Sequence, residues 1–200
     1  MIPVESVAGH GAFRHLSRVT GVLHDLRYAT ARNFAGRNLY GDWDCAWLRD
    51  EAAQGLEAAA AWLARHRPGW RLLVLDALRP HRVQEAIWQD VVGTPMQRYF
   101  ADPVHRSIHS FGMAVDVTLV DPQGAEADMG SGFDEMSELS HPALHADHLA
   151  NGRLTAVQVG QRESLRAALP KGGFGGITTE WWHFDHGDRD HVRRALPLVY

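Results

Sequence analysis

The sequence contains a single cysteine, Cys45, among its 200 residues. One thiol cannot form a disulfide within the chain, and it cannot build a zinc site of the cysteine-rich type. Any metal bound by this chain must therefore be held by histidine, aspartate or glutamate. Histidine is abundant, with 13 residues, so the side chains for such a site are present.

The sequence also lacks an excess of positive charge and any long apolar stretch. Its formal net charge is -4 and its isoelectric point is near 6.3, which provides no basic field for nucleic acid. The sequence has no run of roughly 18 apolar residues that could span a membrane. It also has no basic segment followed by an apolar one, the pattern of a secretory signal. We therefore expect a soluble protein that binds neither nucleic acid nor membrane. It would be cytoplasmic, or periplasmic if a leader has been removed.

The length of 200 residues predicts one domain over residues 1–200. Hydrophobic residues make up 45% of the chain and charged residues 22%, which is enough apolar material for a core. The segment before residue 48 has weak periodicity and is expected to be irregular, with short strands. Beyond it we predict helices over 50–66 (with Asp50 as N-cap), 82–92 and 161–169, strands over 71–77, 113–120 and 178–184, and loops over 121–152. Helices and strands do not alternate strictly, so the pattern favours an α+β fold over a doubly wound sheet.

Two short segments combine histidine with carboxylate side chains. The first runs from Ser107 to Asp116 and contains His109, and the second is Glu180-Trp-Trp-His183. Catalytic zinc sites use three ligands of these types and keep a further position open. Asp116 lies within an apolar predicted strand, where burying an ionised carboxylate costs free energy unless it is paired or binds a metal. A metal site formed by these segments is one interpretation, and coincidence in a histidine-rich chain is the other.

Strand geometry says how these residues could meet. His109 and Asp116 are seven positions apart, so a straight strand would place them on opposite faces. Gly112 stands where a turn is needed between them. After it the regular alternation begins, with one face formed by Met113, Val115, Val117 and Leu119. By the same argument Glu180 should lie in a turn and His183 in the strand, which would let Glu180 reach a metal-bound water without being a ligand.

A second group of histidines, at 141–148, competes with these two segments and has no accompanying apolar face. We expect a solvated loop or helix for His141, His145 and His148 with Asp147 among them, and surface positions for His186 and His191. Trp181 and Trp182 are expected in the core, as walls of the site.

Arg79 follows the predicted strand over 71–77, where catalytic side chains are often displayed. Position alone leaves two interpretations open, a salt bridge to Asp76 or a role in the site.

At this point the residues resemble a known family, the D-alanyl-D-alanine dipeptidases of the type associated with vancomycin resistance. These belong with zinc D-Ala-D-Ala peptidases, lysostaphin-like enzymes and hedgehog domains. The superfamily patterns are Ser-x-His-x-x-Gly-x-Ala-x-Asp, met at 107–116, and Glu-x-Trp-His-Phe, met at 180–184. Three further elements narrow the resemblance to the dipeptidases. They are Asp-Ala-x-Arg-Pro at 76–80, Asp-Leu-Arg-Tyr-Ala-Thr-x-x-Asn-Phe-x-Gly at 25–36, and Asp-Met-Gly…Phe-Asp-x-x-Ser…Ser-His at 128–141. The sequence departs from the familiar pattern at Ile108, Phe111 and Met113 and after Gly187.

The resemblance implies a fold, a cofactor and a role for each site residue. It implies a small, mainly antiparallel central sheet that carries one Zn²⁺ per chain and is flanked by helices. The ligands would be His109, Asp116 and His183, with Glu180 as general base and acid. By the same resemblance Arg79 would stabilise the oxyanion, and the substrate would be the small D,D-dipeptide of a peptidoglycan precursor. Its carboxylate would be bound by Ser107 and its ammonium by Tyr28 and Asp134.

Two other functions stay open. A zinc carboxypeptidase or endopeptidase acting on longer peptidoglycan peptides would need an open groove and no carboxylate for the substrate amine. A non-catalytic zinc-binding module would not need Glu180 and Arg79, and the presence of both speaks against it.

Overall fold

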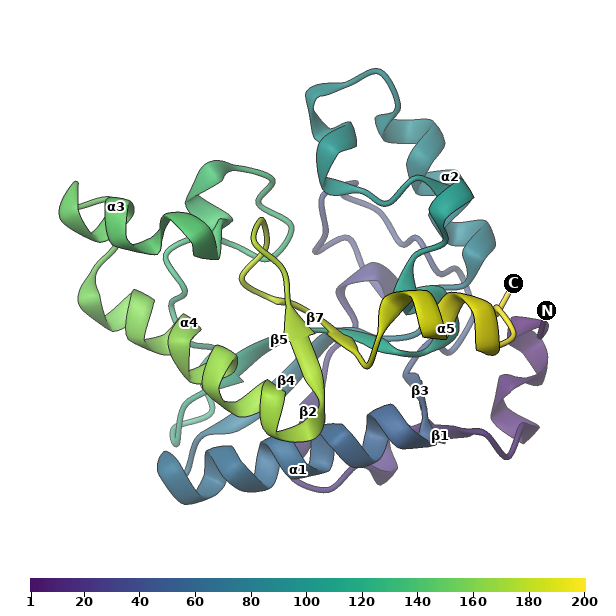
Figure 1. Ribbon diagram of the computed structural model, residues 1–200, viewed down its shortest axis with the longest axis horizontal. Coiled ribbons are helices and arrows are strands. Elements are labelled where there is room, and N and C mark those ends of the chain that lie inside the picture. The colour runs from purple at the N-terminus through teal and green to yellow at the C-terminus, as the bar shows by residue number, and fades with distance from the viewer.

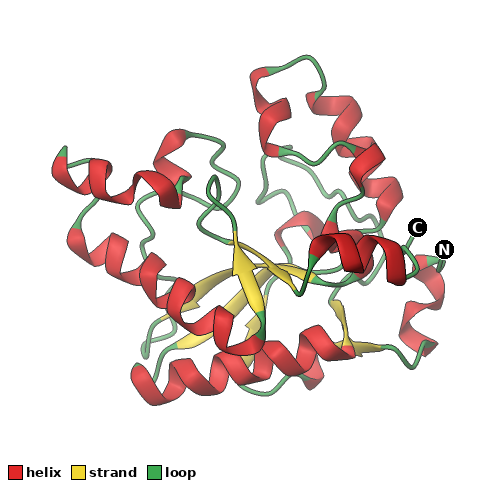
Figure 2. Cartoon of the chain, viewed as in Figure 1, coloured by secondary structure: helices red, strands yellow, loops and turns green.

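The structure is a computed structural model that describes residues 1–200. The α-helices are α1 (Asp50–His66), α2 (His81–Val91), α3 (His145–Ala150), α4 (Ala156–Ala168) and α5 (Arg189–Ala195). The strands are β1 (Phe13–His15), β2 (Val22–His24), β3 (Trp47–Arg49), β4 (Arg71–Asp76), β5 (Ala114–Val120), β6 (Phe174–Gly176) and β7 (His183–His186). Short 3-10 helices are η1 (Val4–Gly9), η2 (Leu16–Arg18), η3 (Arg27–Ala29), η4 (Pro95–Tyr99), η5 (Pro103–His105), η6 (Ile108–Phe111), η7 (Glu138–Ser140), η8 (Pro142–Leu144) and η9 (Leu169–Gly172). The mixed content confirms the α+β prediction (Figure 2).

A five-stranded sheet in the order β2-β4-β5-β7-β6 lies at the centre of the molecule (Figure 1). β2 runs parallel to β4, and every other neighbouring pair is antiparallel, which confirms the mainly antiparallel sheet. β1 and β3 form a separate antiparallel ribbon. In the central sheet Asp116 of β5 is the register partner of His183 of β7. Two of the candidate ligands are therefore cross-strand neighbours.

Helix α1 runs along one face of this sheet (Figure 1). Its buried side consists of Ala52, Ala53, Leu56, Ala59, Ala60 and Leu63. The same core contains the predicted apolar face of β5, namely Met113, Val115, Val117 and Leu119. Because successive side chains of a strand point to opposite faces, Asp116 projects away from α1. The helix spans the predicted residues, but its N-cap is Arg49 and not Asp50, whose carboxylate bonds Arg14 and Gln54 instead.

The segment 178–184 is not the strand that its aromatic and β-branched residues predict. Residues 177–182 form the loop of a hairpin between β6 and β7, and the chain pairs in the sheet only from His183 onward. Trp181 and Trp182 are both buried, as expected of core residues. The Trp182 carbonyl accepts a hydrogen bond from the Val117 amide at 2.9 Å. Packing of two consecutive tryptophans thus overrides the local strand preference.

Helix α4 begins at Ala156 and not near residue 161. Thr155 and Gln158 form a capping box that starts it. Its first turn exposes Val157 to solvent, so the apolar periodicity begins later than the helix itself. None of the helices is both long enough and apolar enough to cross a lipid bilayer.

The predicted solvent exposure of the second histidine group is wrong for two members. His145 and His148 are buried. The ring of His145 contacts the Glu163 carboxylate at 3.2 Å, and His148 Nε2 lies 2.8 Å from the Glu138 carbonyl. His145 thus joins α3 to α4 and His148 joins α3 to η7, tertiary contacts that sequence periodicity does not reveal.

The two C-terminal histidines differ from each other. His186 is half-buried and packs edge-on against Phe174, so its predicted surface position is wrong. His191 is exposed, as predicted.

Candidate active site

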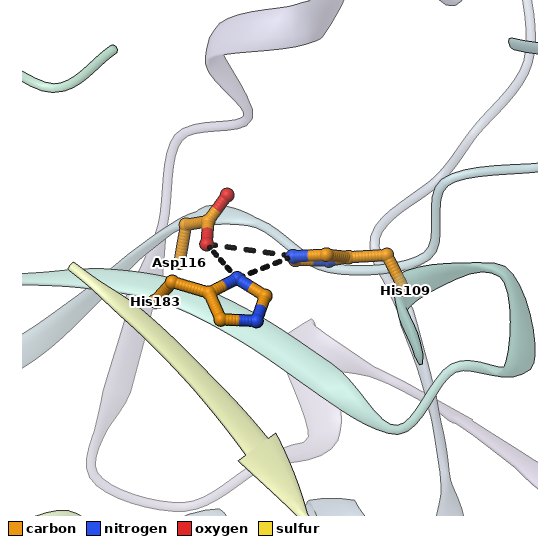
Figure 3. A group of neighbouring side chains, drawn as sticks. All are labelled: His109, Asp116 and His183. Atoms are coloured by element: carbon orange, nitrogen blue, oxygen red, sulfur yellow. Dashed lines mark hydrogen bonds and ion pairs between the residues drawn. The ribbon is translucent and has the colours of Figure 1, made fainter. Parts of the chain in front are cut away.

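His109, Asp116 and His183 point toward one another from three different elements (Figure 3). His109 comes from η6, Asp116 from β5 and His183 from the start of β7. His109 Nε2 lies 3.2 Å from His183 Nδ1 and 3.4 Å from Asp116 Oδ1, and His183 Nδ1 lies 2.9 Å from the same oxygen. Gly112 makes this possible, since its φ of 69° turns the chain between η6 and β5 as predicted.

The donor set fits a metal ion. Donor atoms about 2.0–2.1 Å from a tetrahedral ion such as zinc lie about 3.3 Å from one another. The three distances between the donors, 2.9, 3.2 and 3.4 Å, are of this size. Two imidazoles and a carboxylate, with no thiolate, are typical of catalytic sites that keep a position open.

Outer partners orient both imidazole rings. His109 Nδ1 lies 2.7 Å from the Ala77 carbonyl, and His183 Nε2 lies 3.0 Å from Asp185 Oδ1. When the rings are neutral and those nitrogens donate, His109 Nε2 and His183 Nδ1 carry the lone pairs that face Asp116. Arg189 in turn donates to Asp185 at 2.5 Å. Sequence reasoning missed Asp185, although its spacing of two residues from His183 on a predicted strand was a usable signal.

The charges of the donors depend on each other. Burial alone would raise the pKa of Asp116, but His109 and His183 hold it well below its usual range. Burial would lower the pKa of His183, yet Asp185 and Asp116 raise it well above the ordinary value. Before a metal binds, a proton is therefore held between these groups.

Glu180 lies in the hairpin loop 177–182, as the turn argument predicts, and only 9% of it is exposed. Its pKa is raised to about 7, chiefly by burial; the charge of His183 opposes this rise and the charge of Asp116 supports it. A carboxyl with a pKa near neutrality can both accept and donate a proton at physiological pH.

Arg79 makes the predicted salt bridge to Asp76 and also lines the cavity beside the donor residues. Its guanidinium donates to Asp76 Oδ2 at 2.7 and 3.0 Å and to Gln84 at 3.0 Å. It also lies 3.6 Å from Asp116 Oδ2 and over the Tyr28 ring. These contacts fix a buried positive charge beside the donor triangle, which is formed by His109, Asp116 and His183.

A cavity of about 370 Å³ opens beside these groups, within the range of small-molecule sites. All eight predicted site residues line it: Tyr28, Arg79, Ser107, His109, Asp116, Asp134, Glu180 and His183. Tyr28 and Asp134 also contact each other, with 3.5 Å between the hydroxyl and Oδ1. Burial raises the pKa of both groups well above their usual values. Asp134 has a positive φ of 59°, a strained conformation of the kind that clusters at functional sites.

Comparison with known proteins agrees with the resemblance seen in the motifs. A family model described as D-ala-D-ala dipeptidase matches residues 13–198. This chain belongs to the D-ala-D-ala dipeptidase family. The D-alanyl-D-alanine dipeptidase of Escherichia coli is 37% identical over 162 residues, which cover 80% of this chain and 77% of that protein. The enzyme of the same name from Enterococcus faecium is 32% identical over 186 residues, covering 83% and 86%.

A match among solved structures is the LdcB LD-carboxypeptidase, with a TM-score of 0.45 and 18% sequence identity. The alignment covers 75% of this chain and 64% of that one, so this member of the dipeptidase family spans less than two thirds of the carboxypeptidase chain.

Proposed function

We propose that this peptidase hydrolyses D-alanyl-D-alanine to two D-alanines as a single zinc D,D-dipeptidase domain over residues 1–200. One Zn²⁺ per chain would be held by His109, Asp116 and His183. The observation that carries the proposal is the triangle of two imidazoles and one carboxylate beside the buried acid Glu180 in one cavity. The names of the curated relatives support the choice of dipeptide. When bound, Zn²⁺ would polarise the scissile carbonyl and lower the pKa of a water molecule.

Glu180 is the proposed general base and acid. Its carboxylate takes a proton from the attacking water and passes it to the amine of the leaving D-alanine, so that no proton is gained or lost overall. The raised pKa, about 7, supports this role because the group changes its protonation state at little cost near neutral pH. Its place in a loop beside the donors, and not among them, leaves it free to act on the water.

Arg79 is the proposed partner of the oxyanion. The negative charge that develops on the carbonyl oxygen needs a fixed donor in a site with little water. Asp76 and Gln84 accept three hydrogen bonds from the guanidinium and so fix its orientation. Little reorganisation is therefore needed during the reaction.

The two ends of the dipeptide are assigned to opposite kinds of group. Asp134 and Tyr28 would bind the ammonium, since a cation relieves the cost of ionising a buried carboxyl. The hydroxyl of Ser107, which makes no capping hydrogen bond to η6, would bind the carboxylate. A pocket that recognises both charged ends rejects longer peptides.

The test is release of D-alanine by metal-free and zinc-loaded protein. The substrates are D-Ala-D-Ala, L-Ala-L-Ala and an N-acylated D-Ala-D-Ala. Zinc-dependent cleavage of the free D,D-dipeptide alone is expected. Cleavage of the acylated substrate would instead indicate a carboxypeptidase or endopeptidase. Zinc binding without any cleavage would indicate a non-catalytic module.

A further inference from the structure

Arg193 of α5 also lines the cavity, and sequence reasoning did not single it out. Its side chain is 30% exposed, and its Nε donates to the carbonyl of Arg106 at 3.1 Å. Arg106 has a φ of 55°, a conformation that costs free energy for a residue with a side chain and persists where its surroundings hold it. The residue that follows is Ser107. Arg193 is thus hydrogen-bonded to the loop that carries Ser107, the residue proposed to bind the substrate carboxylate.

The guanidinium of Arg193 has little negative charge to balance it. Its one carboxylate neighbour is Asp190, at 3.7 Å, and the Asp190 side chain is 75% exposed. An exposed pair at this distance is weak. The ionised carboxylates of the cavity already have other partners, since Asp185 pairs with Arg189 and Asp116 with the donor histidines.

Arg98 also lines the cavity and pairs with no carboxylate, but its surroundings differ from those of Arg193. It is exposed, lies over the ring of Tyr99 and donates to the Tyr99 hydroxyl at 3.1 Å. No hydrogen bond connects it to the loop of Ser107. Of the two, Arg193 is the one placed beside the proposed carboxylate site.

We propose that Arg193 binds the C-terminal carboxylate of the substrate together with the Ser107 hydroxyl. This inference rests on the proposed dipeptidase function and adds a specificity-determining residue to it. Arginine suits the task because its planar fork donates two parallel hydrogen bonds to a carboxylate. The cavity is lined by the guanidinium of Arg193, the hydroxyl of Ser107 and the carboxyl of Asp134, groups that complement both charges of a zwitterionic dipeptide.

The experiment measures binding, so that it does not depend on turnover. Zinc-loaded Glu180→Gln protein is titrated by calorimetry with D-Ala-D-Ala and with its C-terminal amide, which lacks the carboxylate charge. Adding Arg193→Gln should weaken binding of the acid about tenfold, the lower end for a charge-assisted contact because the group is partly exposed. Binding of the amide should not change. The control is Arg194→Gln, which removes the same charge from an exposed neighbour that does not line the cavity.

A Ser107→Ala background separates direct contact from positioning. If Arg193 contacts the substrate carboxylate, Arg193→Gln should still weaken binding of D-Ala-D-Ala in that background. The proposal would be overturned if Arg193→Gln caused no further loss of affinity for D-Ala-D-Ala in that background, or if it weakened binding of D-Ala-D-Ala and of the amide equally. It would also be overturned if Arg193→Gln had the same effect as Arg194→Gln, or if D-Ala-D-Ala did not bind at all. Should the unsubstituted protein hydrolyse no dipeptide, the proposed function fails, while the preference for acid over amide still decides the role of Arg193.

Discussion

Removing the charge of Asp185 should weaken zinc binding although no ligand is altered. Asp185 Oδ1 lies 3.0 Å from His183 Nε2 and so holds the ring with Nδ1 toward Asp116. The Asp185 side chain is only 5% exposed, so water cannot replace the contact. Partners of this kind are typically worth roughly 10- to 100-fold in metal affinity.

The two available substitutions should differ in size. Asp185→Asn keeps an oxygen that accepts from His183 but loses the charge, so the loss should be about tenfold. Asp185→Ala also removes the acceptor, so the loss should approach about a hundredfold, or about 2.7 kcal/mol.

The same change should affect the metal-free fold. Burial opposes ionisation of Asp185, yet His183 and Arg189 lower its pKa to about 2. A carboxyl with a lowered pKa stabilises the folded state above its ordinary pKa of about 3.9, and that contribution is lost as the pH falls toward 2. Asp185→Asn should therefore cost on the order of 2 kcal/mol at neutral pH.

Zinc affinity is measured by competition with a chelator, and stability by urea unfolding of the metal-free protein. Asp190→Asn, on the exposed side of α5, is the control and should change neither quantity. Wild-type zinc affinity in Asp185→Ala would refute the reasoning, because the ring of His183 would then be held without its partner.

Three further predictions follow from the site and the core. Glu180→Ala should keep zinc and lose roughly 10²- to 10⁴-fold in kcat, whereas His109→Ala should lose both zinc and turnover. Metal content and D-alanine release measure these effects, and an active Glu180→Ala protein would disprove the mechanism. The value of kcat/KM should fall as the pH decreases and Glu180 is protonated, with a midpoint below its metal-free pKa of about 7 because a dication favours the carboxylate; a pH profile that is flat below 7 would contradict this. Gly55→Ala should destabilise the fold by about 1–3 kcal/mol in urea unfolding, since its Cβ would lie 2.2 Å from the Gly172 carbonyl oxygen. Gly160→Ala, with nothing near its Cβ, is the control, and equal stability of the two variants would count against the argument.

The meeting of the three proposed metal donors could be predicted from the sequence because strand geometry constrains their positions. A turn at Gly112 was required if His109 and Asp116 were to meet, and the structure has that turn. Asp116 and His183 then lie opposite each other through the pairing of β5 with β7. Periodicity and a single glycine thus account for most of the donor triangle.

The rest of the cavity depends on packing between distant segments. Tyr28 and Asp134 are 106 positions apart in the chain and meet only in the folded molecule. Their candidacy came from resemblance and not from any local pattern. The loop with Glu180 takes its course from the burial of two tryptophans, which local strand preference mispredicts. The position of Arg193 beside Ser107 likewise depends on how α5 packs against η6.

Buried charge at the site would couple the proposed metal binding to protons and to folding. Burial raises the pKa of Glu180 and Asp134, whereas Asp116 stays ionised between two histidines. The raised pKa of His183 means that the metal-free site holds a proton where a donor lone pair is needed. Zinc bound as proposed would have to displace that proton, so its affinity should fall with decreasing pH. Since the donors meet only in the folded chain, zinc should also stabilise the fold by mass action, more strongly at neutral than at acidic pH.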